Sequence, residues 1–501
     1  MLKRTRSFLV LVMLLMTVTM SAQVTTATMS GKVTAQDEPI IGATIVAIHE
    51  PSGTRYGTVT NVSGQFNLQG MRTGGPYKVE ISYVGYQTAI YKGINLLLGE
   101  NYVLNVSLKE SSELLDEVVV TASKESNMKS DRAGAIMNAN RDMISNTPTI
   151  SRSISDIMRL SPQGADVGNG FAVGGGNYRQ SFVTVDGAAF NNTFGLGGNL
   201  PANGSPISLD ALEQVTVAVT PFDVRQSGFT GGAINAVTRS GDNQFRGTAY
   251  MYFNNENLKG SKVDDYELLR SKAQYYTYGA SFGGPIIKDK LFFFVNGEYE
   301  DNVTAGPKSR ARLSDSDDWG SNTANVNRPT VGKMDEIRNY FIDKYDYDPG
   351  RYQGYSIKTP AYKIMARLDW NINDNNKLNF RFTRAHSKDN SGPTSSVSPF
   401  YATDIYDGGT AASKGSGNVN HNAAMYFENS RYFKEYNFTS YASEWNSKWL
   451  DGSLNNVTRV TYSFQDEPRS YEGAADFPSI DILETVLFMH VLDQISFLRA
   501  T

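Results

Sequence analysis

The chain has 501 residues, 47 basic and 51 acidic side chains, a formal net charge of −4 and no cysteine. This length predicts several domains, and the small net charge gives no reason to expect a nucleic-acid partner. The lack of cysteine excludes disulfides, thiolate metal ligands, cysteine nucleophiles and the lipid-modified cysteine of a lipoprotein. The 28 tyrosines and 25 phenylalanines suit a membrane barrel with aromatic girdles, but also a soluble β protein.

The first 22 residues have the pattern of a secretory signal peptide. Lys3, Arg4 and Arg6 precede an apolar run at residues 8–20, and the small residues Ser21 and Ala22 follow it. That order matches a leader with its cleavage site. The alternative, a membrane anchor, is disfavoured because the apolar run is shorter than the roughly 20 residues of a spanning helix. We therefore expect any insertion into a membrane to use β-strands.

Residues 28–109 predict a small all-β domain. Tyr77, Val79, Ile81 and Tyr83 lie on one face of an alternating segment whose other face is polar, which is typical of a half-buried strand. Similar short segments lie at residues 31–33, 39–45, 57–60, 64–68 and 102–108. Together they predict an immunoglobulin- or transthyretin-like β-sandwich of about seven strands.

The next segment, at residues 114–132, combines a β-branched run with polar flanks. Its central residues are Asp116, Glu117, Val118, Val119, Val120, Thr121 and Ala122. An extended run of this kind has free backbone donors and acceptors, and it can add as a strand to the sheet edge of a partner. The alternative is that it forms the last strand of the preceding sandwich.

Residues 133–241 predict a mixed α+β domain. Ile154, Ile157 and Met158 have helical spacing, with Ser153 and Asp156 as its cap. Glycine-rich turns and a β-branched run follow. The glycines at 174–176 are not read as a phosphate loop, because no Gly-Lys-Ser/Thr follows them. The residues that characterise this domain are Val185, Asp186, Gly187, Gly231, Gly232, Asn235, Thr238, Arg239 and Gly241.

Residues 242–475 predict seven membrane strands. We expect them near residues 245–253, 275–283, 291–300, 362–370, 378–382, 436–449 and 454–464. Short turns at residues 284–290, 371–376 and Asp451-Gly452 alternate with long connections, and the long connection at 301–360 includes a short helix with Met334, Ile337 and Phe341. Outer-membrane barrels have short periplasmic turns and long outer loops, so the alternation predicts such a barrel and assigns its sides.

Two stretches resemble a known family. The SLDALEQV run and the GGAINAVTRSG run within residues 207–241 resemble the end of the plug domain of TonB-dependent outer-membrane receptors. The likeness is greatest to the Oar-like branch of Bacteroidetes-type bacteria. Residues 28–109 are similar to the carboxypeptidase-regulatory-like domain that precedes the plug in such receptors. One departure is Gly175, where many plug sequences have an arginine.

The resemblance implies a function and partners. It implies that residues 116–122 are the TonB box, that the characteristic residues of 133–241 shape the plug, and that the chain lies in the Gram-negative outer membrane with its N-terminal domain and plug on the periplasmic side. Implied partners are TonB with ExbB and ExbD, outer-membrane lipid, and an unknown ligand such as a peptide, glycan or metal chelate. A surface lipoprotein partner stays open, and a cofactor is not expected.

Other functional classes receive less support. No H-E-x-x-H motif is present, and His49, His386, His421 and His490 are scattered, so neither a metal site nor an enzyme is expected. A surface adhesin or secretion-linked β protein that does not transport is the alternative function. Dependence on the proton motive force distinguishes the two.

The C-terminal part predicts an incomplete barrel. Plugged transporter barrels have about 22 strands, whereas seven are expected here. Residues 476–501 also lose the alternating pattern and become helix-like. We expect a truncated or frameshifted product. The predicted fold is thus mainly β: a sandwich, an α+β plug and a partial transmembrane antiparallel barrel.

Overall fold

The computed structural model describes residues 24–110, 118–121, 136–149, 152–167, 170–192, 198, 200–219, 230–258, 262–263, 266–267, 272–319, 325–392, 425–449 and 454–471. The predicted signal peptide, the Asp451-Gly452 turn and residues 476–501 lie outside these ranges. Within the described ranges, the structure has no helix of the length and apolar character needed to cross a membrane.

The N-terminal domain is a sandwich of two sheets. In the first, β1 (Ala27–Ala35) pairs with β2 (Glu38–Pro39), β5 (Gln65–Met71), β8 (Asn101–Val103) and β9 (Val106–Ser107). The second has the order β10-β7-β6-β3-β4, formed by Val118–Thr121, Ala89–Leu96, Gly74–Ser82, Thr44–His49 and Thr54–Val59. Alternate residues of each sheet meet in one apolar core, as the alternation predicted.

Two details of the sandwich differ from the prediction. Tyr77, Val79 and Ile81 are fully buried, but β6 ends before Tyr83, which is 37% exposed. Strand β7 was not predicted. Gly93 has a φ of +77°, and the pairing register with β6 shifts opposite it. Such a bulge breaks the alternation from which a strand is recognised.

The central domain, called the plug below, has a five-stranded sheet in the order β11-β16-β17-β14-β15. Its strands are Ile136–Ala139, Leu212–Ala218, Ala233–Thr238, Phe182–Val185 and Ala188–Ala189. Helix α2 (Arg141–Asn146), the hairpin of β12 (Gly164–Asp166) with β13 (Phe171–Val173), and the short helices η1 (Tyr178–Gln180), η2 (Ala202–Gly204) and η3 (Leu209–Ala211) accompany it. Helix α3 (Ile154–Met158) begins with the predicted capping box of Ser153 and Asp156.

The C-terminal part is one large antiparallel sheet, called the barrel wall below. Its main strands follow chain order and are β18 (Arg246–Asn255), β21 (Ala273–Ile287), β22 (Leu291–Ala305), β26 (Ala361–Asn373), β27 (Asn376–Ser391), β28 (Tyr432–Trp449) and β29 (Leu454–Asp466). Strands β25 (Ser356–Lys358) and β30 (Arg469–Tyr471) extend β22 and β28. All seven predicted strands are present, and the sheet is not closed, as expected for a partial barrel.

The two faces of the barrel wall have different characters. On β22, Val295 and Tyr299 are 43% and 44% exposed, whereas the alternating Asn296 and Glu298 are almost completely buried. The apolar row thus faces outward, toward lipid, and the polar row faces the plug, which is the orientation of an outer-membrane barrel. The inward residues Phe294, Met365, Ala385 and Phe438 share one hydrophobic core with the plug.

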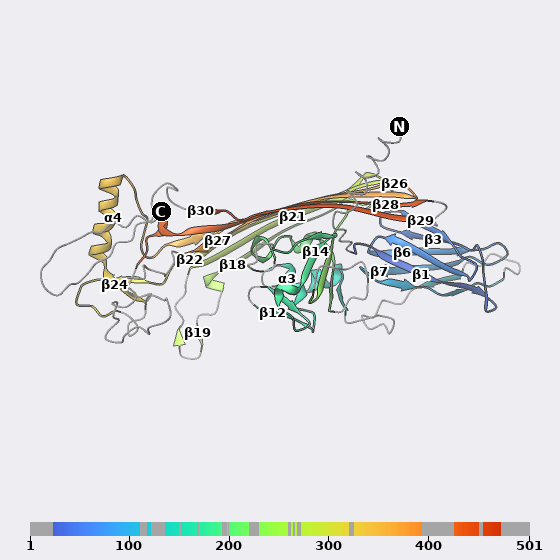
Figure 1. Ribbon diagram of the computed structural model, residues 1–501, viewed down its shortest axis with the longest axis horizontal. Coiled ribbons are helices and arrows are strands. Elements are labelled where there is room, and N and C mark those ends of the chain that lie inside the picture. The colour runs from blue at the N-terminus through green and yellow to red at the C-terminus, as the bar shows by residue number, and fades with distance from the viewer. Residues whose placement is uncertain are drawn as a thin grey trace, which may run out of the picture.

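Figure 1 shows the plug and the sandwich on the same side of the barrel wall, with the sandwich at one end. Helix α4 (Val331–Tyr345), which buries Met334 and Phe341, lies at the opposite end with β24 (Val326–Thr330), the partner of β23 (Arg310–Arg312). Strands β19 (Lys262–Val263) and β20 (Tyr266–Glu267), and short helices η4 (Glu256–Leu258) and η5 (Glu428–Ser430), lie in the connections of the wall. The described short turns meet the sandwich, and the long connection with α4 lies at the far end, in agreement with the predicted parity.

Candidate functional site

The turn between β14 and β15 has a backbone shape that few residues adopt. Asp186 has a φ of +44° and Gly187 a φ of +78°, and Asp-Gly is a favoured pair for a hairpin turn with both angles positive. A side chain at Gly187 would also collide with the guanidinium group of Arg459 on β29, whose Nη1 lies 2.7 Å from the position of a Cβ. The predicted Val-Asp-Gly turn therefore approaches the barrel wall closely.

The Asp186 carboxylate joins the plug to the barrel wall. It accepts hydrogen bonds from the Thr238 backbone N (2.9 Å) and Oγ1 (2.5 Å). It also forms ion pairs with Arg367 of β26 (3.6 Å) and Arg381 of β27. Burial raises the pKa of Asp186, but the two guanidinium groups and the Thr238 hydrogen bonds outweigh burial and lower the pKa below its ordinary value. The Asp186 carboxylate is therefore kept ionised where the plug meets the barrel wall.

The two arginines are anchored unequally. Arg367 also donates to the Thr238 carbonyl oxygen (2.8 Å) and pairs with Asp369 (2.9 Å). Arg381 is 1% exposed and pairs with Asp186. We call Asp186, Thr238, Arg367 and Arg381 the plug latch. Its plug residues, Asp186 and Thr238, are among the residues singled out in the sequence, whereas its two arginines are not.

The remaining predicted plug residues lie around the same sheet. A Cβ at Gly232 would lie 2.3 Å from Val173 Cγ1, so only glycine fits there. Gly231 N donates to Gln180 O (3.1 Å), and Asn235 Oδ1 accepts from Thr184 Oγ1 (2.7 Å). Val185 is fully buried.

Arg239 and Gly241 lie where the chain passes from the plug to the wall. The Arg239 guanidinium pairs with Asp210 (3.7 Å) and lies 4.8 Å from the centre of the Phe294 ring. The Gly241 carbonyl oxygen accepts from Arg72 of the sandwich (3.0 Å). A Cβ at Gly241 would lie 2.4 Å from Phe293 O. Arg239 and Gly241 thus hold the connection between plug and wall against the sandwich and the barrel wall.

A second polar cluster between plug and wall was not predicted. Lys363 Nζ lies 2.7 Å from Glu298 and 2.5 Å from Glu300. Glu298 also accepts from Ser208 Oγ (3.0 Å) and Tyr250 OH (2.6 Å). Every charge of the cluster is paired, as buried charges require. Glu298 and Glu300 lie two positions apart on β22, and the residues that bind them come from segments distant in the sequence.

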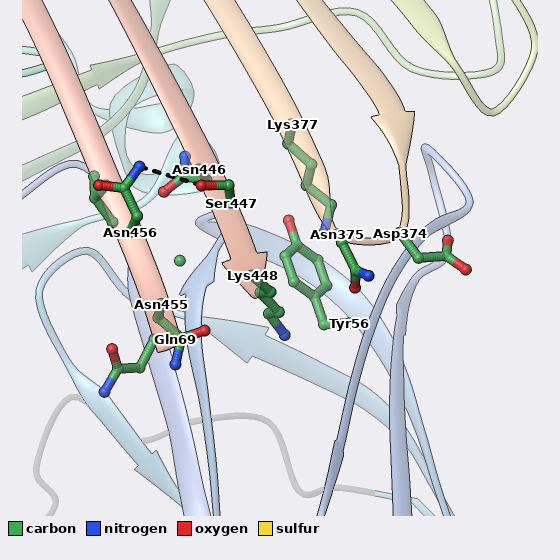
Figure 2. Close-up of a pocket in the computed structure, with 12 residues that line it drawn as sticks. Tyr56, Gln69, Asp374, Asn375, Lys377, Asn446, Ser447, Lys448, Asn455 and Asn456 are labelled. Carbon is green, nitrogen blue, oxygen red and sulfur yellow. Dashed lines mark hydrogen bonds between the residues drawn. The ribbon is translucent and has the colours of Figure 1, made fainter. Parts of the chain in front are cut away.

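The edge strand β4 of the sandwich contacts the end of the barrel wall (Figure 2). Lys377 Nζ of β27 donates to the Arg55 carbonyl oxygen of β4 (3.0 Å), and Lys448 Nζ of β28 donates to the Gly57 carbonyl oxygen (3.2 Å). Lys377 Nζ also lies 3.6 Å from the centre of the Tyr56 ring. Tyr56, Lys377 and Lys448 are among the residues that line a small pocket, shown in Figure 2. We call Lys377 and Lys448 the rim lysines.

The sandwich also binds the plug. Gln214 of β16 is 3% exposed; its Oε1 accepts from Leu98 N (2.8 Å) and its Nε2 donates to Leu96 O (3.1 Å). One amide side chain thus satisfies two backbone groups at the end of β7, in the manner of a paired strand. Thr25 Oγ1 adds a bond to Glu444 of the wall (2.6 Å).

The predicted TonB-box segment is only partly described. Residues 118–121 form β10 and pair in parallel with β7. Asp116, Glu117 and Ala122 lie outside the described residues. The alternative drawn from the sequence, a last strand of the sandwich, therefore describes the backbone pairing of these four residues. Among the described residues, no group of three His, Asp or Glu side chains is placed to hold a metal ion.

Comparison with known families defines the class of protein. The model of the outer membrane beta barrel domain matches residues 237–488, slightly more than half of the chain, and that of the carboxypeptidase regulatory-like domain matches residues 28–109. The chain belongs to the outer-membrane β-barrel family, and it is a protein of the Gram-negative outer membrane.

Two curated relatives narrow the class. The chain is 26% identical over 242 residues to the TonB-dependent transporter Oar of Myxococcus xanthus, covering 46% of this chain and 20% of Oar. It is 27% identical over 281 residues to the TonB-dependent receptor SusC of Bacteroides thetaiotaomicron, covering 53% of this chain and 26% of SusC. The chain is homologous to both and spans about a quarter or less of each.

Two solved structures match part of the chain. The outer membrane transporter YddB from Escherichia coli matches with a TM-score of 0.45 and 11% identity, over 68% of this chain and 40% of YddB. The siderophore receptor PirA from Acinetobacter baumannii matches with a TM-score of 0.40 and 17% identity, over 66% of this chain and 39% of PirA.

Proposed function

We propose that this protein is a TonB-dependent outer-membrane receptor or transporter that imports a ligand when its plug is rearranged. The observation that carries the proposal is the plug itself, a globular domain packed on the inward face of an outer-membrane barrel wall. Homology to proteins named as a TonB-dependent transporter and a TonB-dependent receptor supports it. The proposal includes no enzymatic activity.

The plug sheet has two edges with different attachments. Strand β11 is one edge, follows the TonB-box segment in the chain, and pairs with β16 through only four residues. Strand β15 is the other edge and follows directly after Asp186 of the plug latch. A pull on the segment before β11 would thus strip a short edge strand first, while the latch keeps the other edge on the wall.

The proposed partners follow from this mechanism. TonB, energised by ExbB and ExbD, would bind residues 116–122, and outer-membrane lipid would surround the wall. The ligand, whether a peptide, a glycan or a metal chelate, would bind on the outer side, with or without a surface lipoprotein.

The proposal is tested by crosslinking to TonB in cells. The unaltered chain is compared with a deletion of residues 116–122 and with a matched seven-residue deletion of 124–130. We expect the TonB adduct to disappear only in the first deletion, because it alone removes the strand that TonB would bind. A TonB adduct that still forms without residues 116–122 would contradict this mechanism. An adduct whose amount does not change when the proton motive force is lost would favour the adhesin.

A further inference from the structure

The short segment before β1, residues 24–26, contacts all three parts of the chain and is called the strap below. Its first residue, Val24, is 4% exposed and shares a small apolar cluster with Leu98 of the sandwich and Val237 of the plug. Val237 directly precedes Thr238, one of the two plug residues of the plug latch. The strap thus packs beside the latch at one of its members.

The second residue of the strap reaches the other plug member of the latch through an arginine. Thr25 Oγ1 donates to Glu444 (2.6 Å) and accepts from Arg459 Nη2 (2.6 Å), so the hydroxyl bridges an ion pair of the wall. The same guanidinium group lies against Gly187, the residue that follows Asp186 in the tight turn. Thr25 therefore binds the side chain on which the turn of the latch rests.

The strap is fixed to the sandwich. The Thr26 carbonyl oxygen accepts from Gly99 N (3.2 Å), and β1 begins at the next residue. Thr25 also lines a cavity of about 80 Å³ together with Asp186 and Arg367 of the plug latch. Sandwich, strap and latch therefore meet around one cavity, and a shift of the sandwich acts directly on the strap.

We propose that the strap holds the plug latch closed, with Thr25 as a positioning residue that acts through Arg459. The Thr25 hydroxyl keeps the Arg459 guanidinium against Gly187, and the turn at Gly187 keeps the Asp186 carboxylate within reach of its partners. Coupling of this kind travels through contiguous contacts. A displacement of the sandwich that withdraws the strap would free Arg459 and weaken the latch. Its consequence for transport rests on the function proposed above, but the coupling itself does not.

In the contrasting model the strap fastens only the sandwich and leaves the latch as it is. The two models differ at one backbone amide, because Thr238 N donates to Asp186 (2.9 Å). The hydrogen exchange of this amide with solvent reports how often the latch opens. Ile144 N, which donates to Asn140 O in α2 (2.9 Å), reports on another part of the plug.

The experiment measures hydrogen exchange by mass spectrometry on the full chain in detergent micelles, without TonB. Thr25→Val removes the hydroxyl and keeps the branched shape of the side chain. The matched control is Thr26→Val. Thr26 lines the same cavity, but its hydroxyl has no hydrogen-bond partner among the described residues.

We expect Thr25→Val to speed exchange at Thr238 by about threefold or more, within the range for loss of one hydrogen bond. Exchange at Ile144, and exchange at Thr238 in the Thr26→Val control, should change by less than about twofold. A smaller effect at Thr238 would overturn the inference, and so would an equal effect in the control or at Ile144.

A second variant tests the route through Arg459. Arg459→Lys is measured alone and together with Thr25→Val. Because the hydroxyl acts through the guanidinium group, Thr25→Val should add less than about twofold to exchange at Thr238 when lysine is present. A full, separate effect would overturn the inference. TonB takes no part in these measurements, so either failure leaves the proposed function standing.

Discussion

Asp186 places one carboxylate against two inward-facing guanidinium groups of the barrel wall. Its left-handed backbone puts the carboxylate at the end of a tight turn, where Thr238 can bind both of its oxygens. Removing one member of a buried ion pair leaves the other charge uncompensated, which costs far more than losing an exposed pair. We therefore expect a single-atom change in the plug latch to have a large effect on the free energy of unfolding.

Replacing Asp186 with Asn removes the charge but keeps the size of the side chain. The backbone conformation is kept as well, because Asn also adopts the left-handed region. We expect a loss of about 3–5 kcal/mol in the free energy of unfolding, since Arg381 would stay buried without its anion. Urea denaturation in detergent micelles measures it. Asp166→Asn, which removes an exposed pair with Arg159, is the control, with a loss under about 1 kcal/mol. Equal losses in the two variants would contradict the latch.

At the residue scale, the sequence identifies some of the residues that form the contacts between domains, but not which residues they meet. Val185, Asp186 and Gly187 were singled out in the sequence, and the strands that carry Arg367 and Arg381 were predicted. Their meeting with Asp186 could not be predicted, because it depends on how the plug is rotated and shifted against the wall. The same applies to Gln214, whose buried amide binds residues 116 and 118 positions away.

Among the elements, β4 is the strand on which the sandwich meets the barrel wall. Its Arg55 and Gly57 carbonyl groups are bound by the rim lysines rather than by another strand. Covering a strand edge in this way also prevents it from pairing with other chains. The rim lysines come from the ends of β27 and β28 on the periplasmic side, so these strand ends also hold the sandwich there.

Replacing both rim lysines with Met keeps their aliphatic stems and removes their donors. We expect the sandwich to move relative to the wall, because two backbone hydrogen bonds and the contact with the Tyr56 ring are lost together. Spin labels on cysteines introduced at Val62 and Lys288 report the distance between the two parts. The expected result is a clearly broader distance distribution.

The control for this experiment lies at the other end of the molecule. Lys333→Met with Lys344→Met changes two lysines of α4, and it should leave the distribution as it is in the unaltered chain. A distribution that stays narrow without the rim lysines would show that other contacts hold the sandwich.

The sequence predicts regular elements well and irregular ones poorly. Helix α3 is recognisable because its cap and its apolar spacing agree, and the seven wall strands because each alternates over many residues. Strand β7 is not recognisable, because Gly93 and the bulge around it interrupt the pattern. That strand turned out to hold both β10 and the contact with the plug.

On the scale of the whole molecule, the outward face of the barrel wall has exposed apolar side chains along the length of its strands. Val460, near the middle of β29, is 66% exposed, and Leu454, at its periplasmic end, is 45% exposed. An outward row of exposed apolar side chains is typical of a strand whose outer face meets lipid. The pattern of the faces, rather than any one residue, therefore defines the membrane belt.

Val460→Arg should destabilise the chain folded in lipid vesicles by about 2–4 kcal/mol, whereas Leu454→Arg should cost only about 0–1 kcal/mol, because the cost of a charge falls toward the interface. Urea titration of the chain in vesicles measures both. Equal costs at the two positions would mean that β29 does not cross the bilayer in this orientation.

Phe294, Met365 and Ala385 complete the interior of the plug as much as that of the wall. If the plug left in one piece, these side chains would be wetted, at a cost of roughly 25 cal/mol for each Å² of apolar surface. The inward face of the wall would then expose these apolar side chains to water. Under the transport function proposed above, we therefore expect a passage to open through local unfolding of a small part of the plug while the rest stays packed on the wall.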